Sequence, residues 1–521
     1  MLAPTSNASF PNQMRAFLLL LFFSCLLVWI SLGCQSDNDT STAKDPIITE
    51  GERLAQQYCS NCHLPVAPDA LDKETWHKRV LPAMALKLGL EVWQKTNYYF
   101  PPTASIKQTD WIKLQNYYES LAPEKPIKAS PSVPLVNDWS IFKLHKPAEI
   151  KSEVSTTTMV TFDSASRQIY TSNETSAGLY RWSTDLKPTL VRTLPSPAVQ
   201  ARVLPNGNGA QRALLTCIGT MLAVDQPKGE ILELTLARTP ESAPVVLASQ
   251  LPRPIDTTPG DFNKDGLTDY IVCGFGHEAG GLYWLRQRPD HQFEKVIIKE
   301  IAGATQVIPG DFNNDGWLDF MALFAHADEG IWLFTNDQKG SFSEQNLLRF
   351  PPVYGSTSFQ LVDFNKDGKL DILYTCGDNS DYSRILKRFH GVYIFTNQGN
   401  FRYKQTWFYP VNGCTKAIAK DFDLDGDLDI ASIAFFGDLK NNPAETFIYF
   451  EQNKPLAFTP HAVPISSYGR WICMDANDWD HDGDTDIVLG NFSMGFLNEV
   501  KFTPTWNGYL PLVVLENTTR K

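Results

Sequence analysis

Two thiols and an imidazole stand within five residues of one another in the stretch Y-C-S-N-C-H at residues 58–63. Two residues between the cysteines allow both thiols to reach the two vinyl groups of a haem, and the next residue then points its imidazole at the iron. We therefore expect one covalent haem c on Cys59 and Cys62, with His63 as an axial ligand. A thioredoxin-like redox pair and a zinc site are the alternatives. No βαβ pattern surrounds the stretch, and His77 is the one further zinc ligand nearby.

The second axial position has two candidate side chains. Met84 is the only methionine between residues 15 and 158, and His77 is the only other histidine between residues 64 and 144. The segment L-P-A-M at residues 81–84 resembles the L-P-x-M segment of class I cytochromes c, and this resemblance implies Met84 as the ligand. His77 and an open position remain alternatives. A Met/His pair raises the haem potential, which suits the relay of single electrons.

Two amphipathic segments must position these ligands. Residues 51–58 and 109–121 repeat apolar residues at helical spacing. In cytochromes c the first and last helices cross, with a glycine against an aromatic residue, and Gly51 against the Trp111 and Tyr118 region is similar to that arrangement. The resemblance covers residues 48–122 and implies a small all-α cytochrome c domain.

A second kind of chemistry comes from an acidic nonapeptide that starts at residues 261, 311, 363, 421 and 478. Positions 1, 3, 5 and 9 offer side-chain oxygens, position 7 offers a backbone carbonyl, and glycine at position 6 permits a sharp turn. Such an oxygen set suits Ca²⁺ better than Mg²⁺, so we expect about five structural calcium ions. The expected ligands are Asp261, Asn263, Asp265, Leu267, Asp269, Asp311, Asn313, Asp315, Trp317, Asp319, Asp363, Asn365, Asp367, Lys369, Asp371, Asp421, Asp423, Asp425, Asp427, Asp429, Asp478, Asp480, Asp482, Asp484 and Asp486.

These nonapeptides lie between predicted strands, at separations of 50, 52, 58 and 57 residues. EF-hand and dockerin loops take their last ligand from position 12 and lie between helices, so they fit poorly. The pattern resembles the FG-GAP/VCBS-type repeat of integrin-α-like β-propellers. Two weaker copies precede it, at residues 158–173 and 203–217. The second has Pro205, Gly207 and Gly209 at ligand positions, and neither copy should bind calcium.

Seven repeats predict an all-β, seven-bladed propeller after the helical domain. The last predicted strand, at residues 511–517, resembles a third blade strand, and residues 138–145 resemble a fourth. Pairing of the two would close the ring and remove its open edges.

The N-terminus indicates export. Arg15 precedes 18 uncharged and mostly apolar residues that end at Cys34, and S-L-G-C resembles the lipobox of bacterial lipoproteins. That resemblance implies lipidation of Cys34 and anchoring in the cell envelope, at the outer membrane or its surface. A plain signal peptide and an uncleaved anchor are the alternatives. The expected parts are a signal peptide (1–33), a flexible tether (34–47), the haem domain (48–122), a proline-rich linker (123–136) and the propeller (137–521).

Loops after the second strands carry the candidate catalytic side chains His277, Glu278, His326 and Asp328, with Glu329, Asp378 and Asp381 beside them. They could bind a second metal or act as acid and base, or they could be solvated loop residues. The five propeller cysteines are interpreted as buried small side chains, and one disulfide between blades is the alternative.

A formal net charge of −12 argues against nucleic acid as a partner. The sequence favours an electron-transfer lipoprotein whose propeller docks a partner protein or a glycan. The alternative is an extracytoplasmic oxidoreductase that acts on sugars or alcohols, with the haem as electron acceptor. Adhesion or scaffolding with an incidental haem would leave the C-S-N-C-H and L-P-A-M segments unexplained.

Overall fold

The computed structural model of the protein describes residues 45–149, 151, 153–205, 211–236, 243–326, 328–380, 384–495 and 502–520. The expected signal peptide, Cys34 and most of the tether lie outside the described residues, as do Gly207, Gly209 and Asp381. Among the helices in these ranges, none combines the length and the hydropathy that a membrane span requires.

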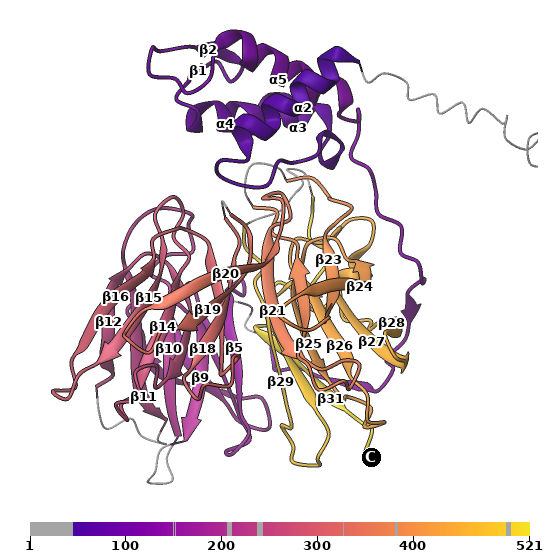
Figure 1. Cartoon of the computed structure of the whole chain (residues 1–521). Helices are drawn as coiled ribbons and strands as arrows, with labels where there is room; N and C mark the ends of the chain where they lie inside the picture. The colour runs from indigo at the N-terminus through magenta and orange to yellow at the C-terminus, as the bar shows by residue number, and fades with distance from the viewer. Residues whose placement is uncertain are drawn as a thin grey trace, which may run out of the picture. The chain divides into compact units, whose positions relative to one another are not determined.

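Short helices and one small hairpin make up residues 46–122 (Figure 1). In chain order they are α2 (Pro46–Cys59), the 3₁₀ turn η1 (Pro68–Ala70), α3 (Lys73–Thr75), the π-helical turn η2 (Trp76–Val80), α4 (Leu81–Lys87), β1 (Glu91–Trp93), β2 (Asn97–Tyr99) and α5 (Gln108–Leu121).

The first and last of these helices cross at Gly51. A Cβ atom on Gly51 would lie 2.2 Å from Cβ of Tyr117, so only glycine allows this approach. The aromatic partner is therefore Tyr117, one residue from the Tyr118 that the sequence had suggested. Tyr118 instead packs against Trp76, with 4.2 Å between the ring centroids and the rings tilted by 31°, inside the same core.

The remaining strands form seven sheets among the described residues, antiparallel throughout except for one added strand in blade six (Figure 1). Blades one to three consist of β5 (Thr157–Asp163), β6 (Gln168–Asn173), β7 (Gly178–Trp182) and β8 (Pro188–Thr193); β9 (Ala198–Pro205), β10 (Gln211–Cys217), β11 (Gly229–Leu236) and β12 (Val245–Leu251); and β13 (Pro254–Gly260), β14 (Asp269–Gly274), β15 (Gly281–Gln287) and β16 (Phe293–Lys299).

Blades four and five consist of β17 (Ala304–Gly310), β18 (Asp319–Phe324), β19 (Gly330–Asn336) and β20 (Phe342–Arg349); and β21 (Ser356–Val362), β22 (Asp371–Cys376), β23 (Gly391–Asn397) and β24 (Tyr403–Pro410). Blade six has β25 (Cys414–Lys420), β26 (Asp429–Ala434), the 3₁₀ turn η3 (Pro443–Thr446), β27 (Phe447–Lys454), β28 (Ala457–Ala462) and the added strand β3 (Val136–Asn137). Blade seven has β29 (Trp471–Asn477), β30 (Asp486–Asn491), β31 (Leu512–Asn517) and β4 (Phe142–His145).

The core lies between neighbouring sheets. In blades three to seven every residue of the second strand is buried, as expected for strands that are covered on both faces. The aromatic residue at position 2 of the nonapeptide packs against the next blade. The ring centroids of Phe262 and Phe320 lie 6.1 Å apart, and those of Phe422 and Phe142 lie 6.2 Å apart. The repeated D-F and D-W pairs therefore encode blade-to-blade packing as well as an acidic loop.

The ring closes as the sequence predicts. Strand β4, from the start of the propeller, pairs antiparallel with β31, from its end, with Leu144 opposite Leu515. Closure thus joins segments that are far apart in the sequence, since Lys143 pairs with Glu516, 373 residues later.

One part of the linker differs from expectation. Its last residue begins β3, which pairs in parallel with β28 and gives blade six a fifth strand. Just before β3, the carbonyl of Val133 accepts a 2.9 Å hydrogen bond from the Tyr409 hydroxyl, and Leu135 packs against the core of blades five and six. The end of the proline-rich segment is therefore part of the propeller.

The five propeller cysteines are free, and four of them are fully buried. This agrees with the interpretation of these residues as small core side chains and not with a disulfide between blades.

Candidate functional site

The C-S-N-C-H stretch lies where α2 ends. The helix stops at Cys59, and the backbone N–H groups of Cys62 and His63 both donate to the Cys59 carbonyl across 3.3 Å. This turn leaves the Cys62 side chain exposed and the Cys59 side chain half-buried.

The imidazole of His63 is oriented by its neighbour. Nδ1 lies 2.8 Å from the carbonyl oxygen of Leu64. Because a carbonyl can only accept, Nδ1 carries the proton in this contact, and the neutral ring of that tautomer can ligate a metal through Nε2. Histidines that ligate a metal commonly donate their other ring N–H to a carbonyl or carboxylate in this way.

Met84 and His77, the two candidates for the second axial ligand, differ in their contacts. Met84 is half-buried on α4, and its thioether can act as a soft metal ligand or pack as an apolar side chain. His77 lies on η2 and its Nδ1 makes a 2.7 Å contact with Oε1 of Glu119 on α5. The carboxylate therefore already engages the His77 ring.

The five acidic loops share one backbone conformation. Position 4 has a left-handed φ in every copy, from 56° at Lys264 to 65° at His481, and the glycine at position 6 has φ between 81° and 97°. In the first loop the Asp261 carboxylate accepts from the backbone N–H groups of Asp265 and Gly266. These turns gather the side-chain oxygens at the loop tip.

Two of the loops bring three carboxylates together. Oxygens of Asp421, Asp423 and Asp425 lie within 4.8 Å of one another, as do oxygens of the second group, Asp478, Asp480 and Asp486. In the blade-six loop Oδ2 of Asp421 accepts from Gly426 N–H, whereas Oδ1 is buried and accepts no hydrogen bond from any described residue. A buried carboxylate oxygen without a donor, among like charges, is chemically suited to a cation.

The aspartate at position 9 has a structural role that the sequence did not indicate. Asp319 accepts from the backbone N–H of Phe312 (3.1 Å) and of Asn336 (2.8 Å), and so pins the loop to the third strand of its blade. All five position-9 side chains are fully buried: Asp269, Asp319, Asp371, Asp429 and Asp486.

Burial raises the pKa of each position-9 carboxyl, to about 6 for Asp269 and to about 7 for Asp429 and Asp486, against the effect of the backbone donors. A bound cation would favour the charged form and oppose this shift.

The described side chains of the loops after the second strands make several different contacts. Asp328 pairs with Arg349, and His326 packs against Phe275 with 4.6 Å between ring centroids. Glu329 is fully buried and accepts from the backbone N–H of Ser356 across 2.7 Å.

The backbone N–H groups of His277, Glu278 and Ala279 all donate to Asp225 from a loop of blade two. Among the described residues, groups of three carboxylate, thiol or imidazole side chains whose ligand atoms lie within 4.8 Å of one another occur only in the acidic loops.

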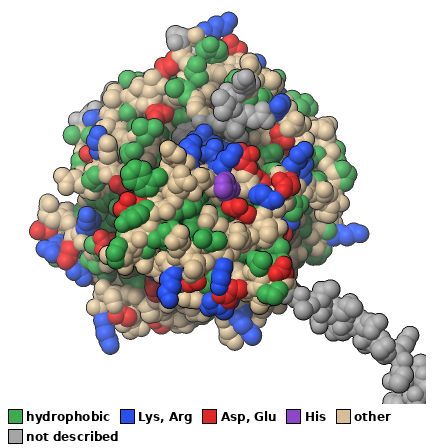
Figure 2. All heavy atoms as spheres, turned by 90° about the horizontal axis from the view of Figure 1, so that it is seen from above, with side chains coloured by type: hydrophobic (Ala, Val, Ile, Leu, Met, Phe, Trp, Pro, Cys, Tyr) green, Lys and Arg blue, Asp and Glu red, His purple; other side chains and the backbone are tan. Residues whose placement is uncertain are grey.

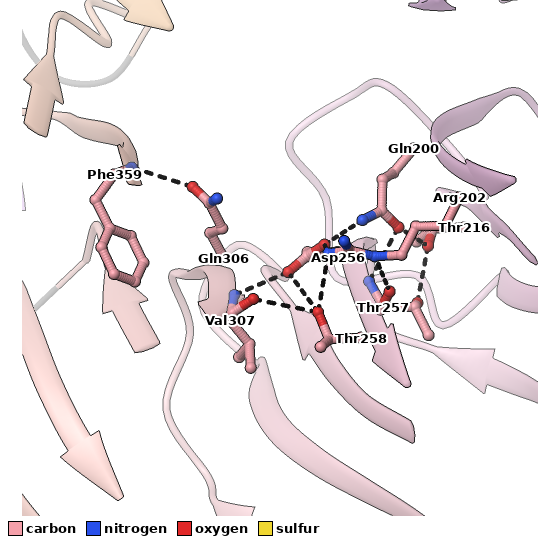
Figure 3. Close-up of polar contacts among 9 residues, drawn as sticks. All are labelled: Gln200, Arg202, Thr216, Asp256, Thr257, Thr258, Gln306, Val307 and Phe359. Carbon is pink, nitrogen blue, oxygen red and sulfur yellow. Dashed lines mark hydrogen bonds and ion pairs between the residues drawn. The ribbon is translucent and has the colours of Figure 1, made fainter. Parts of the chain in front are cut away.

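A polar network that the sequence did not predict follows the inner strands around the channel (Figure 3). Asp256 accepts from the backbone N–H of Val307 in the next blade across 2.8 Å, and Gln306 accepts from Phe359 across 3.1 Å. In the same way, side-chain oxygens of Gln200, Gln360 and Asp475 accept from the backbone N–H groups of Thr257, Ala419 and Phe162, respectively. In the sequence these are isolated polar residues within predicted strands, and their spacing does not indicate a network.

Residues 261–322 and 321–374 match the FG-GAP-like repeat. No curated protein matches the sequence. Among solved structures, the chain is similar to a catalytically inactive form of virginiamycin B lyase from Staphylococcus aureus. The identity is 12%, the TM-score is 0.44, and the match covers 72% of this chain and 99% of that one.

A periplasmic gluconolactonase from Pseudomonas aeruginosa is also similar, with 12% identity, a TM-score of 0.41, and coverage of 70% of this chain and 100% of that one. The repeat match and the seven sheets give the same conclusion: the chain contains FG-GAP-like repeats that are built into a seven-bladed β-propeller.

Proposed function

We propose that the protein is a haem c electron-transfer protein whose propeller is stabilised by calcium and docks a partner protein or a glycan. The observation that carries the proposal is the C-S-N-C-H turn at the end of α2, with Nδ1 of His63 bonded to Leu64 and Nε2 left for a metal. A haem bound there would accept and pass on single electrons.

Different residues would attach the haem and ligate its iron. Cys59 and Cys62 form the covalent attachment, and the Leu64 carbonyl fixes the tautomer and orientation of His63. Met84 is the proposed ligand on the other side, because the segment L-P-A-M resembles the ligand segment of class I cytochromes c. The crossing of α2 and α5 at Gly51 supports the proposal, since it ties the helix that ends in the attachment turn to the last helix of the region.

Calcium is the second proposed cofactor. The carboxylates of the five acidic loops would hold the ions at the ends of the inner strands, and the convergence of Asp421, Asp423 and Asp425 supports this. Their role is to neutralise clustered charge between two strands of a blade, and no step of electron transfer is assigned to them.

Export and lipidation at Cys34 complete the proposal and place the protein at the outer membrane or its surface. Haem attachment to such a motif occurs outside the cytoplasm, which is consistent with the apolar N-terminal segment. On the face shown in Figure 2, Lys and Arg side chains lie among Asp and Glu side chains.

The first test is haem attachment to the full chain, produced with calcium in an export-competent host that has haem-attachment machinery. We expect a haem that stays with the denatured polypeptide, and its loss in the double variant Cys59→Ser, Cys62→Ser. Met84→Ala should alter the absorption spectrum of the oxidised protein, whereas His77→Ala, the matched control, should not. Wild-type protein without haem, from a host whose own cytochromes are loaded, would refute the proposal.

The same preparation separates electron transfer from the oxidoreductase alternative. After oxidation, the haem bands are followed while sugars, glycans and alcohols are added. Reduction by one compound class would make the protein an oxidoreductase. Reduction by a small chemical donor alone would support the relay and turn the search to a protein partner.

A further inference from the structure

The channel of the propeller contains a cavity of about 400 Å³ among the described residues. Inner strands of five blades line it: β5, β9, β13, β17 and β29. Its wall combines the apolar side chains of Phe162, Pro259 and Pro309 with the charged side chains of Arg202 and Asp475. The volume is within the range of small-molecule sites, roughly 300–1,000 Å³.

Arg202 is held rigidly on one side of this cavity (Figure 3). Its Nε donates to the Thr257 carbonyl across 2.8 Å, and its Nη2 donates to Oδ1 of Asp256 and to Oγ1 of Thr258, both across 2.9 Å. These contacts use three of the five N–H groups of the guanidinium. The two N–H groups on Nη1 have no hydrogen-bond partner in the described structure, and the side chain stays 35% exposed.

The two carboxylates of the channel are, in contrast, well supplied with donors. Asp256 accepts from Gln200, Arg202, Thr258 and the backbone of Val307. Asp475 accepts from the Thr161 hydroxyl and from the backbone N–H groups of Phe162 and Ala476. A carboxylate offers about four acceptor sites, so little capacity remains on either.

Arg202 and Asp475 are the charged side chains among the residues that line the cavity, and Asp475 already accepts from three donors. The unsatisfied group in the cavity is thus a pair of cationic N–H donors.

We propose that this cavity binds a small organic carboxylate, whose oxygens receive the two N–H groups of Nη1 of Arg202. The carbon skeleton of the ligand would pack against Phe162, Pro259 and Pro309. A guanidinium pre-organised by Asp256 and the two threonines loses little side-chain entropy on binding, and charge-assisted hydrogen bonds are the strong ones. The site uses no residue of the haem-attachment turn or the acidic loops, so it does not depend on either cofactor proposal.

The test is calorimetric titration of the full, calcium-saturated protein with lactate, benzoate and gluconate, and with the neutral partners lactamide, benzamide and glucose. We expect saturable binding of at least one carboxylate and at least about tenfold weaker binding of its neutral partner, the loss of one charge-assisted contact. Added sodium chloride should weaken the binding.

Three variants make the result decisive. Arg202→Gln should lower the affinity for the carboxylate at least tenfold, and Ala201→Leu should do so by filling the cavity while leaving every charge in place. Arg212→Gln is the matched control: it removes an arginine of the same blade with the same exposure (36%) and a carboxylate partner, Glu233, outside the cavity. Arg212→Gln should bind as the wild type does.

Absence of saturable binding of any carboxylate to the wild type would overturn the proposal. Equal binding of a carboxylate and its neutral partner would also overturn it, in favour of a polyol or amide site. Unchanged affinity in both Arg202→Gln and Ala201→Leu, each folded by circular dichroism, would place the ligand elsewhere.

Discussion

The backbone N–H of Asn517, the last residue of β31, donates to Oδ1 of Asp486 across 2.8 Å. The side-chain Nδ2 of Asn517 donates to two further acceptors, the carbonyls of Phe422 (2.7 Å) and Thr485 (3.1 Å). One residue near the C-terminus thus joins the acidic loops of blades six and seven. Asn336 makes the same pair of contacts between blades three and four, with Phe262 and Leu318.

Asn517→Ala should destabilise the propeller, because it removes the Nδ2 donor of the buried Phe422 carbonyl and of the partly buried Thr485 carbonyl. We expect the free energy of unfolding to fall by about 1–3 kcal/mol, the range for an unsatisfied buried polar group. Urea unfolding at fixed calcium concentration measures it. Asn397→Ala is the control, since Nδ2 of Asn397 donates to the Leu370 carbonyl of its own blade in an exposed 3.2 Å contact. Its Oδ1 accepts from the backbone N–H two residues later, as that of Asn517 does. Equal losses in the two variants would contradict the role assigned to the Asn517 bridge.

Phe142→Ala should be more damaging, because Phe142 brings the closing strand into the core. The ring is 4% exposed and meets Phe422, Phe447 and Tyr449 edge-on. Removal of a buried phenyl costs about 3–5 kcal/mol. Thermal unfolding would report it as a lowered Tm, with Trp139→Ala, 39% exposed and three residues away, as the near-neutral control. A Tm that stays at the wild-type value would mean that β4 does not hold the ring closed.

The repeats made the propeller predictable, because each blade repeats the same turn and the same apolar strand. The pairing of β4 with β31 was also predictable, since residues 138–145 resemble a fourth blade strand and the last blade has only three predicted strands. The pairing of β3 with blade six was not predictable. The two residues Val136 and Asn137 are too few to show a strand period, and they pair because β28 is the edge strand there.

At the candidate sites, the types of the residues were predictable and many of their partners were not. Glycine at position 6 indicates a turn in any context, but the second role of Asp319 depends on Asn336, 17 residues later. Arg202 looked like any polar residue in a strand. Its significance comes from Asp256, Thr257 and Thr258, which the ring brings beside it from the next blade.

Stability should depend on pH through Glu329. Burial is the main cause that raises the pKa of this carboxyl from its ordinary 4.5 to about 8, against the donors from Ser356. Between these two pH values the unfolded chain loses the proton while the folded chain keeps it. The unfolded state then binds fewer protons, so the free energy of unfolding falls as pH rises from about 4.5 to 8, by at most about 1.4 kcal/mol per pH unit.

Glu329→Gln should flatten this dependence, because the amide keeps an oxygen for the Ser356 N–H and has no proton to lose. Urea unfolding at pH 5, 6, 7 and 8, at constant free calcium, gives the difference between variant and wild type. Glu344→Gln, on the outer strand of the same blade and 46% exposed, is the control. A Glu329→Gln curve parallel to the wild type would show that the carboxyl ionises alike in both states.

Gly51→Ala should loosen the contact between α2 and α5. Alanine favours a helix over glycine by roughly 0.5–1 kcal/mol, but its Cβ would lie 2.2 Å from Cβ of Tyr117, and overpacking of this kind costs about 1–3 kcal/mol. Hydrogen exchange of the full chain, read on peptides from the two helices, should therefore be faster in the variant. In a Tyr117→Gly background the Cβ that causes the clash is gone, so the same substitution should leave exchange unchanged or slow it. Faster exchange in both backgrounds would mean that Gly51 is needed for some reason other than the approach of Tyr117.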